Sequence, residues 1–195
     1  KKMKIILASK SGVRKKILDN NNIISEVVHS NVDEEEVKNS LEEAGANPLD
    51  ISKNLAELKS IKVSKQHADI LVLGADSVIS LNDKIINKPK NRDEAFSILK
   101  TLNGSTHYLI SSVCISKNGS MIWNHSDSSE LKMKSHNENE LKSYLSKIET
   151  KTLLAYGVYQ IEAGGMNLFY SVKGDKDSIM GLPVKHIINY IKQYK

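Results

Sequence analysis

The sequence predicts an α/β protein with a mixed, twisted sheet flanked by helices. Segments typical of helices and of strands alternate along the chain, which is the pattern of the α/β class. Two antiparallel hairpins are also predicted, about Asn82-Asp83 and about Asn118-Gly119, so the sheet should contain both strand directions. The length of 195 residues, with no repeat or linker, predicts one domain over residues 1–195.

The first half of the chain predicts three strands and three helices. In order they are a strand over 4–9, a helix over 11–20, a strand over 23–30, helices over 36–45 and 50–66, and a strand over 68–77. The last of these strands is almost continuously apolar, which is typical of burial on both faces. The helix over 50–66 carries Ile51, Leu55 and Leu58 on one face, at spacings of four and three. We expect Asp50 or Ser52 to cap its N-terminus.

The second half predicts more helices and the two hairpins. In order they are a hairpin over 78–87, a helix over 92–104, strands over 106–116 and 120–134, a helix over 138–149, a glycine-containing stretch with short strands, and a terminal helix over 182–193. Asn118-Gly119 is the strongest hairpin signal in the chain. The terminal helix has Pro183 near its first turn, where a proline is well tolerated.

Composition narrows the class of partner. The formal net charge is +5, from 28 Lys and Arg against 23 Asp and Glu. The lysines are spread along the chain, which favours a solvated surface over a nucleic-acid patch, whereas an anionic small molecule would suit the same sign. Aromatic residues make up only 5% of the chain, which argues against stacking on bases. No nucleic-acid partner is therefore expected.

Cysteine usage and hydropathy indicate the compartment. Cys114 is the one cysteine, so no intrachain disulfide can form, and it is expected to be a small core residue. No apolar run approaches the about 18 residues of a membrane span, and the apolar part of the N-terminus is too short for a signal peptide. We expect a cytoplasmic protein without a membrane partner. The six histidines are scattered without metal-ligand spacing, so no zinc site is expected.

Asp76 is the first candidate for chemistry. It stands at the end of the predicted strand over 68–77, and ligands of open α/β sheets bind at the carboxyl ends of strands. A carboxylate there can hold a hard cation or position a water molecule. The alternative is an Asp that only forms a turn or caps a helix. Asp33 and Glu34 follow another strand, where an acidic start of a helix is the alternative.

Basic and hydroxyl side chains supply the complementary part of a site. Ser9, Ser11 and Gly12 form a predicted turn at a helix start, and Arg14 follows, which is a suitable anion site. A solvated basic helix is the alternative. Lys88 precedes Pro89 and is therefore extended, so it can point back toward Asp76. Carboxylates gather divalent cations and basic side chains neutralise phosphate, so together they suit a polyphosphate substrate with Mg²⁺ or Mn²⁺.

At these residues the chain resembles the Maf-like nucleoside triphosphate pyrophosphatases. "LASKSGVRKKIL" at 7–18 is similar to the family's opening "LASxSPRRxxLL". "VDE" at 32–34, "LAELKS" at 55–60 and "GADSVISLNDKIINKPKNRDEAFSILKTLNGSTH" at 74–107 follow the family's order and spacing. "GDKDSIMGLP" at 174–183 resembles its closing motif. The likeness covers nearly the whole chain.

The resemblance implies a fold, a reaction and site residues. The fold would be an elongated, two-lobed α/β unit of the Maf/ITPase-like kind with a central cleft, commonly a homodimer. The reaction would be hydrolysis of a nucleoside triphosphate to the monophosphate and pyrophosphate with a divalent metal. Some members of the family are linked to inhibition of septum formation. By position, the site residues are the catalytic acid–base group or metal ligand Asp76, the metal-site carboxylate Glu34, and the substrate-binding residues Ser9, Arg14, Lys59 and Lys88.

Departures from the family pattern bear on which base the nucleotide substrate carries. Val13 stands where the family has the first of two arginines, and Ser77 stands where the dTTP- and UTP-cleaving members have threonine. "YQIEAGG" at 159–165 replaces their "YGIQGLG", which puts Glu162 in the place of a base-reading glutamine. A glutamate in that place resembles the subgroup that acts on 7-methyl-GTP, and a carboxylate can accept hydrogen bonds from the donors of guanine. The alternatives are a dTTP/UTP pyrophosphatase, with Gln160 as reader in a shifted register, or a nucleotide-binding inhibitor of septum formation without important catalysis.

Overall fold

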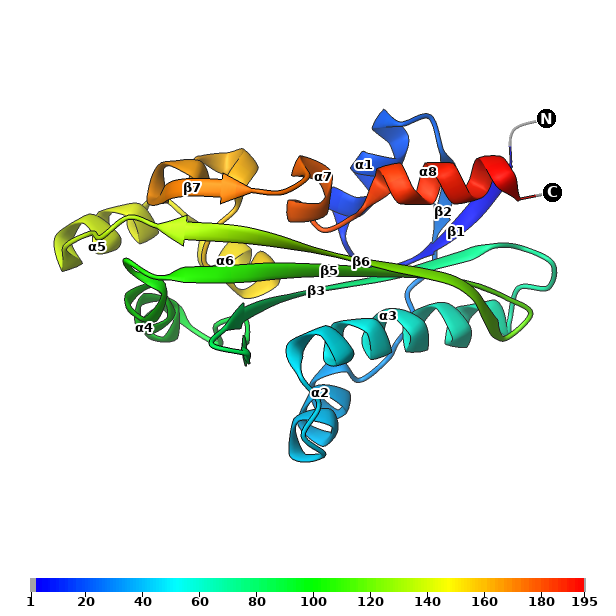
Figure 1. The fold of residues 1–195 in the computed structure, drawn as a ribbon, viewed down its shortest axis with the longest axis horizontal. Coiled ribbons are helices and arrows are strands. Elements are labelled where there is room, and N and C mark those ends of the chain that lie inside the picture. The colour runs from blue at the N-terminus through cyan, green and yellow to red at the C-terminus, as the bar shows by residue number, and fades with distance from the viewer. Residues whose placement is uncertain (1–2, 195) are drawn as a thin grey trace.

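The computed structural model describes residues 3–194, which contain one mixed sheet of seven strands (Figure 1). The strands are β1 (Lys4–Ala8), β2 (Ile24–Val27), β3 (Val72–Leu81), β4 (Lys84–Ile86), β5 (Thr106–Lys117), β6 (Ser120–Met133) and β7 (Phe169–Lys173). Their order is β2-β1-β3-β5-β6-β7, and β4 pairs with β3. β1 runs parallel to β2 and β3, whereas β3–β4, β3–β5, β5–β6 and β6–β7 are antiparallel. The predicted mixed α/β sheet is confirmed. Of the predicted domain over 1–195, residues 1, 2 and 195 lie outside the described part.

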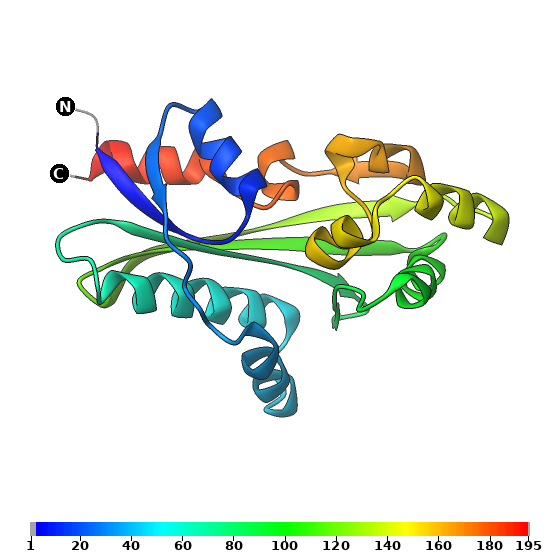
Figure 2. The same cartoon turned by 180° about the vertical axis from the view of Figure 1, so that it is seen from behind.

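Helices cover both faces of the sheet. They are α1 (Gly12–Asn20), α2 (Glu34–Glu43), α3 (Pro48–Ser64), α4 (Arg92–Leu102), α5 (Glu138–Ser146), α6 (Thr150–Tyr156), α7 (Lys176–Ile179) and α8 (Val184–Gln193), with the 3₁₀ turns η1 (Ile161–Ala163) and η2 (Gly165–Leu168). α3 lies along one face, and α1 and α8 lie on the other (Figures 1 and 2). Among the described residues no helix has the length and apolarity that a membrane span requires.

Apolar side chains gather toward the two ends of the long sheet. One cluster joins β1, α1 and α8 and includes Leu18 and Ile187. A second joins α4, α5 and β7 and includes Leu99 and Phe169, and a smaller third cluster packs Val63 of α3 against β1 and β3. Figure 1 shows the two groups of helices at opposite ends of an elongated molecule, with β3, β5 and β6 running between them. This agrees with the elongated, two-lobed shape that the family resemblance implies.

Gly74 of β3 determines how closely α3 packs on the sheet. A Cβ atom there would collide with the carbonyl oxygen of Ala56 and would lie 2.8 Å from the backbone nitrogen of Ser60. Glycine removes this obstacle, so the helix backbone can approach the strand. Asp76 is two residues further along β3 and therefore faces the same helix. The close approach brings Lys59 of α3 within reach of Asp76.

The hairpins are as predicted, but the position of Asp76 in its strand is not. Asn82 and Asp83 have φ of 52° and 62°, and Asn118 and Gly119 have φ of 52° and 81°, as a two-residue hairpin loop requires. The expectation that Asp76 ends a strand is wrong. β3 continues to Leu81 because its pairing with β5 is unbroken past Asp76.

Two local expectations also differ from the structure. Asn47 caps α3, with Pro48 in the first turn, in place of Asp50 or Ser52. The side chain of Asn47 accepts a hydrogen bond from the backbone nitrogen of Asp50 at 2.8 Å. The glycine-containing stretch after residue 149 forms α6, η1, η2 and α7 as well as the single described strand β7. Buried apolar side chains such as Leu153 and Ile179 anchor these short helices to the core.

Candidate active site

One cavity of about 450 Å³ gathers the residues that the sequence analysis singled out. Its size falls in the usual range of about 300–1,000 Å³ for small-molecule sites. The cavity wall draws on β1, α1, α2, α3, β3, the segment after β4 and the stretch over 155–162. The predicted site residues on this wall are Ser9, Val13, Arg14, Glu34, Lys59, Asp76, Ser77, Lys88 and Glu162.

Asp76 lies on the floor of this cavity although it is inside a strand. β1 ends at Ala8, which pairs with Gly74 of β3. Beyond this pair β3 has lost its parallel neighbour, so Asp76 lies just past the carboxyl end of β1. The rule that ligands bind where parallel strands end therefore still applies, through the neighbouring strand. Asp76 is 5% exposed.

Lys59 links the two carboxylates of the site. Its Nζ lies 3.3 Å from Oδ1 of Asp76 and donates a hydrogen bond to the carbonyl oxygen of Ala75 at 3.0 Å. Nζ also forms an ion pair with Glu34, the first residue of α2. Lys59 is itself buried, whereas the side chain of Glu34 is 48% exposed.

The pKa values of the two carboxyl groups are shifted in opposite directions. Burial raises the pKa of Asp76, and the attraction of Lys59, Lys38 and Arg14 offsets this only in part. Burial also opposes ionisation of Glu34, but Lys59, with Lys88 and Lys38, outweighs it and lowers the pKa of Glu34. Two things separate the groups: Asp76 is more buried than Glu34, and Glu34 also has a hydrogen bond from Lys59 that lowers its pKa.

Asp76 has one oxygen without a partner. Oδ2 is buried and accepts no hydrogen bond among the described residues. A buried carboxylate oxygen is costly to leave unpaired, so an unpaired one is consistent with a ligand that completes it. Asp76 and Glu34 offer hard oxygen donors, which are the ligands that Mg²⁺ and Mn²⁺ prefer. The residues present therefore fit a divalent cation, with Oδ2 of Asp76 as the donor atom that Lys59 does not contact.

Arg14 is held in place by four contacts. Its backbone nitrogen donates to the side chain of Ser11, the N-cap of α1, at 3.2 Å. Its Nε donates to the carbonyl oxygen of Gly181 at 2.8 Å. Its two terminal nitrogens donate to Ser77 Oγ at 3.1 Å and to Ser9 Oγ at 3.4 Å. Gly181 has φ of 119°, a left-handed conformation that favours glycine, and this turns its carbonyl toward Arg14.

Basic side chains crowd one side of the cavity. Burial lowers the pKa of Lys88, and repulsion from Arg14 and Lys38 lowers it further. Burial likewise lowers the pKa of Arg14, opposed by Asp76 and Glu34. An anion bound among these groups would relieve their mutual repulsion. The sequence analysis missed Lys38, which lines the same cavity. Its place one turn after Glu34 on the same face of α2 is the signal that would have found it.

The residues that the sequence analysis connected with the base also line the cavity. Glu162 lies in η1 and is exposed at the cavity wall. Gln160 lines the cavity too, but its amide nitrogen donates to the carbonyl oxygen of Gly157 at 3.0 Å. Val13 is half-buried against the core cluster of β1, α1 and α8. Gln160 and Glu162 are the two candidates for contacting the base. Within residues 3–194, the carboxylate of Glu162 makes no hydrogen bond to the protein, so it is available to a ligand.

The fold and the site define an α/β protein that gathers five basic side chains and three carboxylates around one cavity, an arrangement suited to an anionic ligand with a metal ion. The family model described as Maf-like protein matches residues 4–194, and the chain belongs to that family. The resemblance seen in the motifs is confirmed.

Two curated relatives match almost the whole chain. A Pelagibacter ubique (strain HTCC1062) protein named nucleoside triphosphate pyrophosphatase is 60% identical over 191 residues, 98% of each chain. A Rhizobium etli protein named 7-methyl-GTP pyrophosphatase is 34% identical over 190 residues, 97% of this chain and 96% of its own. Among solved structures, a HAM1 protein from Coxiella burnetii matches 67% of this chain and 73% of its own, with TM-score 0.43 and 15% identity. That likeness is too distant to support an inference.

Proposed function

We propose that this protein is a metal-dependent nucleoside triphosphate pyrophosphatase, which hydrolyses its substrate to a nucleoside monophosphate and pyrophosphate. The observation that carries the proposal is the buried carboxyl group of Asp76, with one unpartnered oxygen, in the same cavity as Arg14 and Lys88. The Pelagibacter ubique relative, 60% identical along nearly the full length, bears the name of this activity. Two carboxylates for a cation and several basic groups for phosphates match the needs of phosphoryl chemistry.

The residues divide the reaction between them. Asp76 accepts the proton of the attacking water, for which a raised pKa is suitable. The water oxygen forms a bond to the α-phosphorus, the bond to the bridging oxygen breaks, and pyrophosphate leaves. Arg14 and Lys88 bind the phosphate oxygens and hold the leaving group. A divalent cation held by Asp76 and Glu34 would supply further neutralisation of the phosphate charge.

A panel of nucleotides tests this proposal. Purified protein is incubated with each nucleoside triphosphate, with Mg²⁺, with Mn²⁺ or with a chelator, and pyrophosphate and monophosphate are measured. We expect equal amounts of both products, and we expect the chelator to stop their release. Nucleotide binding without product would favour the alternative of a nucleotide-binding inhibitor of septum formation. Release of orthophosphate instead of pyrophosphate would contradict the assignment.

We further propose that the preferred substrate carries a guanine-like base, with 7-methyl-GTP favoured. Glu162 offers a carboxylate at the cavity wall that can accept from the two donors of a guanine edge. Val13 replaces an arginine of the family pattern that could read a pyrimidine carbonyl, and Ser77 replaces the threonine of the dTTP- and UTP-cleaving members. The Rhizobium etli relative, at 34% identity, is named for 7-methyl-GTP. A higher kcat/KM for dTTP or UTP than for 7-methyl-GTP and GTP would contradict this preference and leave the pyrophosphatase proposal intact.

A further inference from the structure

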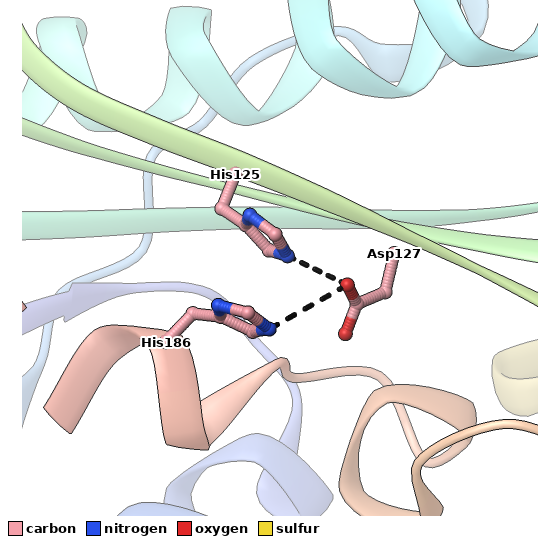
Figure 3. A group of neighbouring side chains, drawn as sticks. All are labelled: His125, Asp127 and His186. Atoms are coloured by element: carbon pink, nitrogen blue, oxygen red, sulfur yellow. Dashed lines mark hydrogen bonds and ion pairs between the residues drawn. The ribbon is translucent and has the colours of Figure 1, made fainter. Parts of the chain in front are cut away.

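Two histidines and an aspartate meet on the sheet face opposite α3, and none of the three lines the cavity described above. His125 and Asp127 lie two residues apart on β6, so their side chains share one face of the strand. His186 reaches them from α8, the helix that covers this face. Figure 3 shows both imidazole rings directing one nitrogen toward the same carboxylate. The histidines show no metal-ligand spacing in the sequence, but two of them, 61 positions apart, become neighbours on folding.

The geometry of the group is set by packing beside it. The rings of His125 and His186 stack with centroids 3.7 Å apart and an interplanar angle of 20°. Two residues earlier on β6 and one turn later on α8, Trp123 and Tyr190 stack in the same way, with centroids 5.0 Å apart. This second stack fixes the register of α8 on β6. The two imidazoles are therefore held side by side.

Asp127 is oriented by a residue outside the group. Ser178 of α7 donates a hydrogen bond to Oδ2 of Asp127 at 2.6 Å, which leaves Oδ1 facing the histidines. Oδ1 lies 2.6 Å from Nε2 of His125 and 3.8 Å from Nε2 of His186. A hydroxyl that holds a ligating carboxylate from behind is a common support of metal sites.

We propose that His125, Asp127 and His186 bind one divalent transition-metal ion of the Zn²⁺ type. Two imidazoles with one carboxylate are a ligand set that Zn²⁺, Co²⁺ and Ni²⁺ favour, whereas Mg²⁺ and Ca²⁺ prefer oxygen ligands alone. The site is separate from the proposed cation position at Asp76 and Glu34. Three protein ligands leave a further position open to water, and the ligand side chains are 25–47% exposed, so an ion can enter.

The distances are compatible with one ion bound to all three residues. Metal–ligand bonds of about 2.0–2.2 Å at tetrahedral angles put ligand atoms about 3.3 Å apart. The two measured nitrogen–oxygen separations, 2.6 and 3.8 Å, lie on either side of that value. The ligand atoms of all three residues lie within 4.8 Å of one another. Coordination would require the two rings to rotate out of their stacked arrangement, because each nitrogen lone pair lies in the plane of its ring. The bound ion would then join α8 to β6.

The test measures Zn²⁺ binding to the full chain. Competition with a chromophoric chelator gives the Zn²⁺ affinity and stoichiometry of the wild type and four variants. Millimolar Mg²⁺ is present to occupy sites that have only oxygen ligands. Asp76→Asn removes the other carboxylate site, and His67→Ala removes a histidine in the turn after α3 as a matched control. His186→Ala removes a half-exposed ligand, and Asp127→Asn keeps the shape of the side chain while weakening the ligand.

We expect one Zn²⁺ per chain in the wild type, Asp76→Asn and His67→Ala, with affinity at least tenfold weaker in His186→Ala and Asp127→Asn. Co²⁺ should give a visible absorption band with the first three proteins that the last two lose. Zn²⁺ should raise the melting temperature of the first three only, because a ligand that binds the folded state stabilises it. Equal Zn²⁺ affinity in the wild type and His186→Ala, or loss of the ion in Asp76→Asn alone, would overturn the proposal.

Discussion

Replacing Asp76 with asparagine should nearly abolish pyrophosphate release and yet make the protein more stable at neutral pH. Activity falls because asparagine cannot accept the proton of the attacking water and is a weaker metal ligand. Loss of a general base typically costs about a hundredfold to ten-thousandfold in rate. Stability rises because burial raises the pKa of Asp76, which means that its charged form is unfavourable in the folded chain.

The gain in stability can be related to the pKa. Each unit by which the pKa is raised in the folded state corresponds to about 1.4 kcal/mol of unfolding free energy at neutral pH. For a chain of this size, 1 kcal/mol moves the melting temperature by about 2–4 °C. Lys59 keeps its contacts with Glu34 and with the carbonyl oxygen of Ala75 in the variant, so the substitution does not leave that cation unpaired.

The raised pKa of Asp76 also determines how the stability of the protein changes with pH. A group with a raised folded pKa contributes stability that is present below its unfolded pKa, near 3.8, and is lost as pH rises through the folded value. The wild type should therefore approach the stability of Asp76→Asn as the medium is acidified, because its carboxyl group then carries a proton.

Urea unfolding at a series of pH values, beside a pyrophosphate-release assay, measures both effects. Asp19→Asn is the matched control, because Asp19 is exposed on α1 and paired with Lys15 at 2.9 Å. It should retain activity and change stability by no more than about 1 kcal/mol. An Asp76→Asn protein that is less stable than the wild type at pH 7 would refute the reasoning about burial, and one that retains most of its activity would remove Asp76 from catalysis.

Three further predictions follow from the cavity and the sheet. Arg14→Ala and Lys88→Ala should each remove a charge-assisted contact worth about 1.5–3 kcal/mol, a loss of roughly tenfold to a hundredfold in kcat/KM; unchanged steady-state kinetics in both would place the phosphates elsewhere. Gly74→Ala should destabilise the chain by about 1–3 kcal/mol in urea unfolding, because the added methyl group would collide with the backbone of α3; wild-type stability would show that α3 can move without cost. Glu162→Gln should narrow the preference for 7-methyl-GTP over dTTP, measured as a ratio of kcat/KM; an unaltered ratio would point to Gln160 as the base reader.

Part of the candidate site was recognisable from local patterns, and Lys59 and Glu162 were named from the family resemblance. Ser9 and Arg14 stand at a strand-to-helix turn, and Lys88 stands before a proline, so each could be placed without knowing the fold. The strands were recognisable from apolar runs and the hairpins from Asn82-Asp83 and Asn118-Gly119. The end of β3 was wrongly predicted near Asp76, because a polar residue inside a strand has the same local pattern as one at its end.

What the sequence could not predict depends on contacts between distant segments. The place of Asp76 beyond the end of β1 follows from the pairing of Ala8 with Gly74, which is a matter of register. The meeting of His125 with His186 requires that α8 pack on β6. The carbonyl oxygen of Gly181 holds Arg14 from 167 residues away. None of these has a signal in a single window of sequence, because the interacting residues are neighbours only in the folded chain.

The pKa of Asp76 is raised and that of Glu34 is lowered, although both carboxylates contact Lys59. These opposite shifts suit the two residues to different parts of the proposed reaction. Asp76 is the more buried of the two carboxylates, and Glu34 has the closer contact with the lysine. Glu34, with its side chain half in water and its pKa lowered, stays ionised and suits the permanent negative charge that a metal ligand needs. Asp76, buried and with its pKa raised, holds a proton more readily and suits the transfer step. Environments that push the pKa values of paired carboxyl groups apart are a general way to separate acid–base work from charge stabilisation. The close approach of α3 at Gly74 maintains that separation, because it keeps Lys59 and Asp76 buried while Glu34 remains at the mouth of the cavity.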